Sequence, residues 1–214
     1  MFQWEQNLQG RCMYMTYKCF LKQLSQYLYE SGEYDISLIC NNEEDALKDI
    51  PSFVHYHPVD MKRGVSLSAF GAIKKIGEIL EREKFDIVQY STPNAAFYAS
   101  IAAKKKKVPV RLYCQWGIRY MGFEGWKRSV FKYLEKKTCD NSTFIEAESH
   151  NIRNFSLDEK LYNADRSCVI WNGSASGVDL NKFDISRKNC WREKIRKQYE
   201  LPDKDIIFVF AGRL

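Results

Sequence analysis

Helical and strand-like patterns of apolar residues alternate along this chain. Residues 17–30 and residues 67–80 each place apolar side chains at helical spacing, three or four positions apart. Short apolar runs follow them, DISLIC at residues 35–40 and FDIVQY at residues 85–90, with the length and composition of strands. Because helices and strands alternate, the sequence predicts an α/β fold with a doubly wound parallel sheet.

The rest of the chain continues this alternation. Thr92 and Pro93 have the residue types expected at the N-cap and first position of a helix that runs through residues 95–103. The pattern also predicts strands at residues 53–57, 108–113, 143–147 and 168–171, and helices at residues 126–137 and 188–199. We therefore expect one sheet to extend from about Asp35 to Trp171.

The two ends of the chain fit this pattern less well. Residues 1–9 make a poor first strand and Gly10 alone a poor phosphate loop, so the first strand is expected upstream or is missing. The run IIFVF at residues 206–210 suits a strand buried on both faces, but no βα unit follows it. We expect a truncated chain, with one domain at residues 1–185 and the connecting helix and first strand of a second at residues 186–214.

Composition is that of an ordinary globular protein, with 45% hydrophobic and 28% charged residues. The formal charge of +6 permits a nucleotide, an acidic lipid or a nucleic acid as a partner without requiring one. The seven cysteines include no C-x-x-C pair, which favours reduced thiols. Residues 1–10 show no signal-peptide pattern and no apolar stretch reaches the ~20 residues that span a bilayer, so we expect a cytoplasmic location.

Familiar catalytic and metal motifs are absent from the sequence. There is no Walker loop, no G-x-G-x-x-G and no G-x-S-x-G nucleophile elbow. His55 and His57 alternate along one predicted strand, so both point to one face. Two histidines without a third ligand are weak evidence for a metal, and the sequence predicts no metal site.

The loop after the predicted strand at residues 108–113 combines aromatic rings with a cation. It contains Trp116, Gly117, Arg119 and Tyr120. Open α/β sheets bind ligands in loops at the carboxyl ends of their strands, and aromatic planes beside an arginine suit a sugar or a phosphate. Aromatic side chains also bury readily in a core, so a structural role fits the same residues.

A second loop, NGSASG at residues 172–177, joins a predicted strand to a helix. Its Asn172, Gly173, Ser174 and Gly177 would let the main chain approach a ligand, and free N–H groups there could hold an anion. The same composition is typical of a turn-rich connector, and spacing alone does not separate the two.

The predicted helix at residues 126–137 is basic and amphipathic. Its apolar residues are Trp126, Val130, Phe131 and Leu134, and its basic residues are Lys127, Arg128, Lys132, Lys136 and Lys137. Such a helix can lie on an anionic membrane surface. A helix packed against the sheet has the same pattern, so both interpretations stay open.

Four segments occur in an order that matches a known family: FDIVQYSTPNAAFYASIAA, RLYCQWGIRYMGF, VIWNGSASGVDLNKFD and WREKIRKQYELPDKDIIFVFAGRL. Together they resemble the N-terminal half of a family 4 glycosyltransferase of the GT-B type, of the kind that builds bacterial surface polysaccharides. The most specific part is N-G-S-x-x-G-V-D-L-x-x-F followed by F-x-G-R-L. The resemblance implies the first of two Rossmann-like domains that face a cleft, and this domain mainly receives the acceptor.

The resemblance also implies roles for individual residues. Gly212 and Arg213 match the G-R pair that opens the donor domain, where the arginine contacts the donor diphosphate. The loop from Trp116 to Tyr120 would form the acceptor-side wall of the cleft. The family often has a histidine in this loop, and its place is taken here by Trp116, which puts a histidine-based role in doubt.

The implied reaction transfers a sugar from a nucleotide sugar to a lipid-linked or saccharide acceptor, with retention of configuration. It needs no bound metal or other cofactor and no nucleic acid, and it would take place at the inner face of the plasma membrane. Because the family's later lysine and paired glutamates do not occur in the sequence, we expect this fragment alone to be inactive. The alternative is a non-catalytic basic α/β module that binds anionic lipid or nucleic acid.

Overall fold

The computed structural model describes residues 17–42, 50–61, 68–175 and 177–210. Its contacts divide the chain into two compact units, residues 1–176 and residues 177–214. The predicted boundary between residues 185 and 186 stays a prediction.

Within the described residues of the first unit, six short strands form two parallel sheets. They are β1 (Ile36–Cys40), β2 (Val54–Pro58), β3 (Ile87–Tyr90), β4 (Val110–Gln115), β5 (Phe144–Ala147) and β6 (Ser167–Cys168). One sheet has the order β1-β2 and the other the order β3-β4-β5-β6. The α/β class with parallel strands is thereby confirmed. The expectation of one continuous sheet is wrong for the described residues, because β1 and β3 do not pair with each other.

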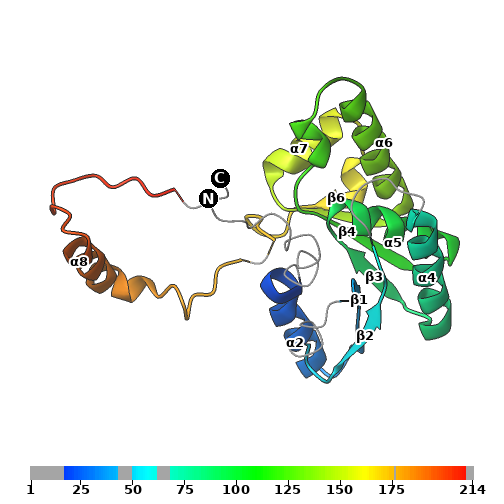
Figure 1. Ribbon diagram of the computed structural model, residues 1–214, viewed down its shortest axis with the longest axis horizontal. Helices are drawn as coiled ribbons and strands as arrows, with labels where there is room; N and C mark the ends of the chain where they lie inside the picture. Colours follow the sequence, from blue (N-terminus) through cyan, green and yellow to red (C-terminus); the bar gives the residue numbers. More distant parts are fainter. Residues whose placement is uncertain (1–16, 43–49, 62–67, 176, 211–214) are drawn as a thin grey trace. The chain divides into compact units, whose positions relative to one another are not determined.

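Helices connect the strands, mostly where the periodicity predicts them. They are η1 (Tyr17–Leu21, a π-helical turn), α2 (Lys22–Glu30), α4 (Ser68–Glu83), α5 (Pro93–Lys105), α6 (Gly125–Asn141), α7 (His150–Asp158) and, in the second unit, α8 (Lys188–Gln198). Figure 1 shows α2 and α4 on opposite sides of β1 and β2, and α4, α5 and α6 side by side. Helices thus cover both sides of the strands, as a doubly wound fold requires.

The starts of helices α5 and α7 differ from what the sequence predicts. Thr92 occupies the N-cap position of α5 before Pro93, but its side chain makes no capping hydrogen bond and its φ is +64°. Helix α7 was not predicted, although Ser149 caps it by accepting a hydrogen bond from the N–H of Ile152. Its sequence, HNIRNFSLD, is too polar to show a strong apolar stripe.

The first unit has two apolar cores. One lies where α4 and α5 meet β1, β3 and the residues after β2, and its buried members include Val59, Met61, Ile76, Leu80 and Tyr98. The other lies under the ends of β3, β4 and β5, and its buried members include Tyr90, Tyr113, Tyr120, Ile145 and Leu161. The second core supports the loops at the carboxyl ends of the strands.

The second unit has little core in its described part. Arg196 of α8 donates from Nη2 to the main-chain oxygen of Asp205 (2.7 Å) and from Nη1 to that of Pro202. Residues 206–210 form no strand, and Phe208 is 93% exposed. The run lies outside both sheets, as expected. The expectation that it forms a strand is wrong for the described residues, because no described strand lies beside it to pair with its main chain.

Candidate functional site

The candidate site is built at the carboxyl ends of β4 and β5, which are parallel neighbours. The last residue of β4, Gln115, lies opposite the last residue of β5, Ala147. The N–H of Glu148 donates to the main-chain oxygen of Gln115 (3.3 Å), and the N–H of Ser174 donates to that of Glu148 (2.7 Å). The end of β4, the residue after β5 and the second predicted loop are therefore joined at one edge of the sheet.

Gly173 is required where the second predicted loop meets the residues after β5. Its φ is +88°, and a Cβ built on it would lie 2.3 Å from the main-chain oxygen of Glu148. Ser174, the next residue, also has a φ of +88°, which is unusual for a residue with a side chain. The glycine thus allows a close approach of main chain to main chain, and the loop is pinned to the end of β5.

A buried polar network holds the end of β4 in place. Gln115 is fully buried, and its Nε2 donates to Glu135 Oε1 of α6 (2.7 Å). Its own Oε1 accepts from the hydroxyls of Ser156 in α7 (3.1 Å) and Tyr162 (2.9 Å). The hydroxyl of Tyr113 also donates to Glu135 Oε1 (2.9 Å). Because every bond in such a network is directional, the strand end from which the first loop departs is fixed.

Glu135 is the ionisable member of this network. Burial raises the pKa of its carboxyl, and the hydrogen bonds from Gln115 and Tyr113 oppose that rise. Burial likewise raises the pKa of Tyr113 well above its ordinary value, with the nearby charge of Glu135 adding to the rise. The tyrosine therefore stays a neutral donor toward the carboxyl oxygen.

Trp116 and Gly117 begin the first predicted loop. The ring of Trp116 is half-buried and lies 5.2 Å from the ring of Phe20 in η1, measured between centroids. Among the described residues its buried Nε1 has no hydrogen-bond partner. Gly117 has a φ of +105°, with open space where a Cβ would lie. A side chain there would be strained by the backbone alone, so glycine is favoured.

Arg119 is the exposed cation of the loop. Its guanidinium lies 4.6 Å from the centroid of the Phe131 ring in α6. Its Nη1 donates to Asn94 Oδ1 at the start of α5 (3.3 Å). The arginine is therefore held over an aromatic plane, between the first turn of α5 and α6, with donors left to meet a ligand.

Tyr120 lies in the core instead of on the loop surface. Its side chain is 0% exposed, and its hydroxyl donates to Glu159 Oε2 (3.3 Å). The guanidinium of Arg128 lies 5.1 Å from the centre of its ring. The ring is not exposed to an acceptor. The alternative role given for the aromatic residues of this loop, burial in the core, therefore fits Tyr120.

The other predicted residues are not brought to one point by the structure. Asn172 is exposed beside Gly173, and Gly177 has a φ of +67° in the second unit. Gly212 and Arg213 lie outside the described residues. The predicted roles of all of these residues, as of Trp116, Gly117 and Arg119, stay predictions.

Sequence reasoning missed the network beneath the loop. Its members Gln115, Glu135, Ser156 and Tyr162 lie up to 47 positions apart, so no local spacing connects them. A usable signal was the placement of a glutamine at the end of the run VRLYCQ, because a polar residue in a buried strand needs buried partners.

Possible metal ligands are dispersed in the described part of the chain. Its residues contain no group of three or more His, Cys, Asp or Glu side chains that could hold a metal ion. His57 Nδ1 lies 3.4 Å from Arg82 Nη2, and burial lowers the pKa of this histidine. No helix of the described residues combines the length and the hydropathy that a bilayer crossing requires.

A family model described as Glycosyl transferase 4-like matches residues 14–149, more than half of the chain. This chain belongs to that family. The capsular polysaccharide biosynthesis glycosyltransferase CapM of Staphylococcus aureus is 28% identical over 159 residues, which are 74% of this chain and 41% of that protein. An Escherichia coli UDP-Gal:alpha-D-GlcNAc-diphosphoundecaprenol alpha-1,3-galactosyltransferase is 27% identical over 196 residues, 87% of this chain and 48% of that protein.

The chain thus spans less than half the length of these two curated relatives. Among solved structures, MurG of Acinetobacter baumannii aligns with 72% of this glycosyltransferase-family chain and 41% of its own, with a TM-score of 0.49 and 13% identity. The S. aureus MnaA–UDP structure aligns with 64% of this chain and 43% of its own, with a TM-score of 0.44 and 16% identity.

Proposed function

We propose that this chain is the acceptor-side domain of a retaining glycosyltransferase that acts in surface-polysaccharide synthesis. The enzyme would move a sugar from a nucleotide-sugar donor to a lipid-linked or saccharide acceptor. Membership of the family supports this, as do the named activities of CapM and of the E. coli galactosyltransferase. The observation that carries the proposal is Arg119, exposed at the carboxyl edge of the sheet on a loop whose base is fixed by buried hydrogen bonds.

The loop offers three features that suit an acceptor. Arg119 presents a planar, permanently charged fork that can pair with a phosphate or a hydroxyl. Gly117 lets the main chain approach a ligand closely. Trp116 adds an apolar ring beside them, part of which is still exposed to a sugar face. Tyr120 supports the loop from below and takes no part in contact.

The donor side would supply the charge stabilisation that the reaction needs. In transfer from a nucleotide sugar the diphosphate leaves with growing negative charge, and cationic side chains and main-chain N–H groups stabilise it. We propose that Gly212 and Arg213 belong to that apparatus, that Asn172, Gly173, Ser174 and Gly177 form a loop of the cleft, and that no metal is bound.

We also propose that α6 holds the enzyme at the cytoplasmic face of the membrane. Its buried side includes Glu135, Thr138 and Cys139, whereas Trp126 and Tyr133 point outward and are 74% and 64% exposed. The ammonium of Lys127 lies 5.9 Å from the centre of the Trp126 ring. Exposed aromatic and basic side chains together suit an anionic lipid surface.

Acceptor binding to the 214-residue chain tests the first proposal. The probes are α-D-GlcNAc-diphosphoundecaprenol in detergent micelles and UDP-Gal, the acceptor and donor in the name of the E. coli relative. Arg119→Ala should weaken acceptor binding by about 1.5–3 kcal/mol, the range for a hydrogen bond to a charged group. Arg82→Ala, which removes an exposed arginine on α4, is the matched control and should leave binding unchanged.

Three results of that titration have different meanings. Binding of UDP-Gal by the unaltered chain that Arg119→Ala abolishes, with acceptor binding intact, would move the loop to the donor side. No effect of Arg119→Ala on either ligand would remove the arginine from the site. Salt-dependent binding to any anionic surface, without a sugar ligand, would favour the non-catalytic basic module.

Flotation with liposomes tests the membrane proposal. Vesicles with anionic lipid should carry the chain, zwitterionic vesicles should not, and Trp126→Ala should reduce the bound fraction. Tyr27→Ala removes an aromatic ring of similar exposure, 71%, from α2 and should have no effect. Equal and negligible binding to both kinds of vesicle would leave α6 as a packed helix only.

A further inference from the structure

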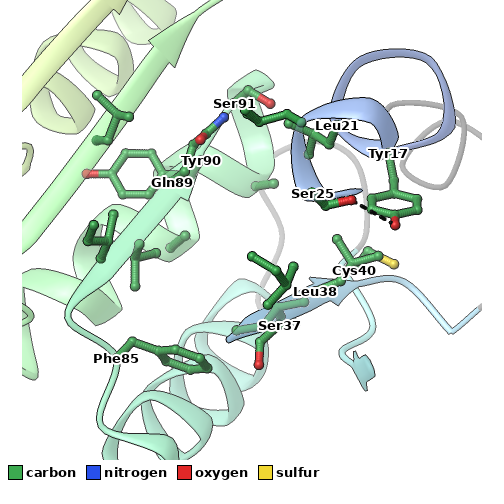
Figure 2. A pocket seen from close by; sticks show the side chains of 18 of the residues that line it. Tyr17, Leu21, Ser25, Ser37, Leu38, Cys40, Phe85, Gln89, Tyr90 and Ser91 are labelled. Carbon is green, nitrogen blue, oxygen red and sulfur yellow. Dashed lines mark hydrogen bonds between the residues drawn. The ribbon is translucent and has the colours of Figure 1, made fainter. Parts of the chain in front are cut away.

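The large cavity of the first unit has mainly apolar walls. It has a volume of about 510 Å³ and lies between β1 and β3. Figure 2 shows Leu38 and Cys40 of β1 on one side of it and Gln89 and Tyr90 of β3 on the other. Asp35 is the one charged residue in the described part of its lining. The charged groups that a polar ligand needs lie elsewhere, and one of them is at the carboxyl ends of β4 and β5.

Glu148, the first residue after β5, is fixed at that edge by its main chain. Its N–H donates to the main-chain oxygen of Gln115 (3.3 Å), which belongs to the peptide group that begins the loop at Trp116. Its main-chain oxygen accepts from the N–H of Ser174 in the second predicted loop (2.7 Å). Both polar main-chain groups of Glu148 are thus used, and the residue is held between the end of β4 and the second predicted loop.

The side chain of Glu148 takes no part in these bonds. It is half-buried, and within the described part of the chain its carboxylate accepts no hydrogen bond and joins no ion pair. Removing a charged group from water is costly unless a partner is supplied. Two other carboxylates of the first unit have such partners. Glu135 accepts from Gln115 (2.7 Å), and Glu159 pairs with Lys132 (2.6 Å). A ligand at this edge would give Glu148 the partner that those two have within the chain.

The chemistry of a carboxylate selects the part of a ligand that it can meet. An ionised carboxylate has only acceptors, and a hydroxyl group donates to it in a short, strong hydrogen bond. A phosphate carries the same sign of charge and would be repelled. The guanidinium of Arg119 has the opposite preference, because it has only donors and a positive charge. The two side chains together suit a ligand that carries both hydroxyl groups and a phosphate.

We propose that Glu148 binds the sugar of the acceptor by accepting a hydrogen bond from one of its hydroxyl groups. Arg119 meets the phosphate of the same acceptor, so the two side chains divide the ligand between them. The inference rests on the proposed function of this edge as the acceptor side. It narrows the acceptor to a sugar that is linked to phosphate, and it adds a binding residue from the end of β5 to the loop at Trp116.

Binding of two lipids in detergent micelles by the 214-residue chain tests this inference. One is α-D-GlcNAc-diphosphoundecaprenol, and the other is undecaprenyl diphosphate, which has the same lipid and phosphates but no sugar. Glu148→Ala should weaken binding of the first by about tenfold or more, as expected when a hydrogen bond to a charged group is lost, and should leave the second unchanged. Arg119→Ala should weaken both. Glu78→Ala removes an exposed carboxylate of α4, and this matched control should change neither.

Changes in the fold can be told apart from loss of the contact. The bonds that hold residue 148 use its main chain, so they remain possible in Glu148→Ala. Unchanged binding of undecaprenyl diphosphate by this variant shows that the edge is intact. Glu148→Gln keeps the size of the side chain and one acceptor oxygen but loses the charge. Its affinity for the sugar-bearing lipid should lie between those of the unaltered chain and Glu148→Ala.

Three results would overturn the inference. Equal binding of the sugar-bearing lipid by the unaltered chain and by Glu148→Ala would remove the glutamate from the site and leave the proposed function in place. Equal weakening of both lipids by Glu148→Ala would show that the glutamate supports the edge and does not recognise the sugar. Binding of neither lipid by the unaltered chain would contradict the proposed function and, with it, this inference.

Discussion

The two borders of the sheets in this chain are built in opposite ways. At the carboxyl ends of β4 and β5, side chains from α6 and α7 converge on Gln115, and the loop at Gly173 is bound to Glu148. Between β1 and β3, apolar side chains face a cavity and two strand edges have no described partner. One border is closed by polar bonds of fixed direction, and the other is open and apolar.

The difference separates two ways of receiving a partner. Directional hydrogen bonds hold the first loop in one geometry, which suits recognition of a small polar ligand by Arg119. Apolar walls do not fix an orientation, so the cavity between β1 and β3 sets no single geometry for a group that enters it. The closed border is therefore suited to orienting a polar ligand and the open border to burying apolar groups.

The largest expected effect comes from the central glutamine of the closed border. Gln115→Leu removes a donor to Glu135 and leaves the hydroxyls of Ser156 and Tyr162 without their acceptor. Unfolding in urea should show a loss of about 3 kcal/mol, since buried groups would lose their partners. Gln89→Leu, in the exposed glutamine of β3, is the control and should change stability by less than about 0.5 kcal/mol. Equal losses would contradict the contrast between the two borders.

Gly173 offers a second way to break the closed border. In Gly173→Ala the new Cβ would meet the main-chain oxygen of Glu148, and the φ of +88° is unfavourable for alanine. We expect a loss of about 2–3 kcal/mol in thermal or urea unfolding. Gly71→Ala lies in α4 with open space around it and should stabilise by about 0.5–1 kcal/mol. A neutral Gly173→Ala would show that the loop is not pinned to β5.

The stability of Glu135→Gln, measured against pH, tests the buried carboxyl group of the closed border. Burial raises the pKa of Glu135 in the folded state, so the folded state holds this proton more tightly than the unfolded state. The resulting stability is fully present below the unfolded pKa of about 4.3 and is lost as pH rises through the raised folded value. Glutamine does not titrate, so the unaltered chain should lose stability relative to Glu135→Gln as the pH rises above about 4.3. A difference that does not vary with pH would mean that Glu135 is not buried as described.

Much of the fold could be predicted because its signals are local. The run DISLIC predicted β1 and FDIVQY predicted β3 within about two residues, since apolar β-rich runs depend little on distant contacts. The division into two sheets could not be predicted. The apolar composition of each run suits a central strand, and it does not show whether β1 and β3 pair with each other. Helix α7 was missed because its burial depends on β5 and not on a stripe of its own.

The sequence predicted which loops form the candidate site, but it did not predict the contacts that hold them. The position of Arg119 followed from the rule that ligands bind at the carboxyl ends of parallel strands. The network beneath it depends on Gln115 meeting Glu135 and Tyr162 from two other segments, and no spacing in one sequence reveals such a meeting. For the same reason, sequence alone did not decide that Tyr120 is core while Arg119 is exposed.

Amide hydrogen exchange of the free chain tests the contrast between the two borders most directly. Strands β4 and β5, paired on both sides, should exchange slowly and together. Half or more of the amides in β1 and β3 should exchange at least tenfold faster, because one edge of each strand faces the cavity between them. Uniformly slow exchange across β1, β3, β4 and β5 in the free chain would contradict an open cavity between β1 and β3.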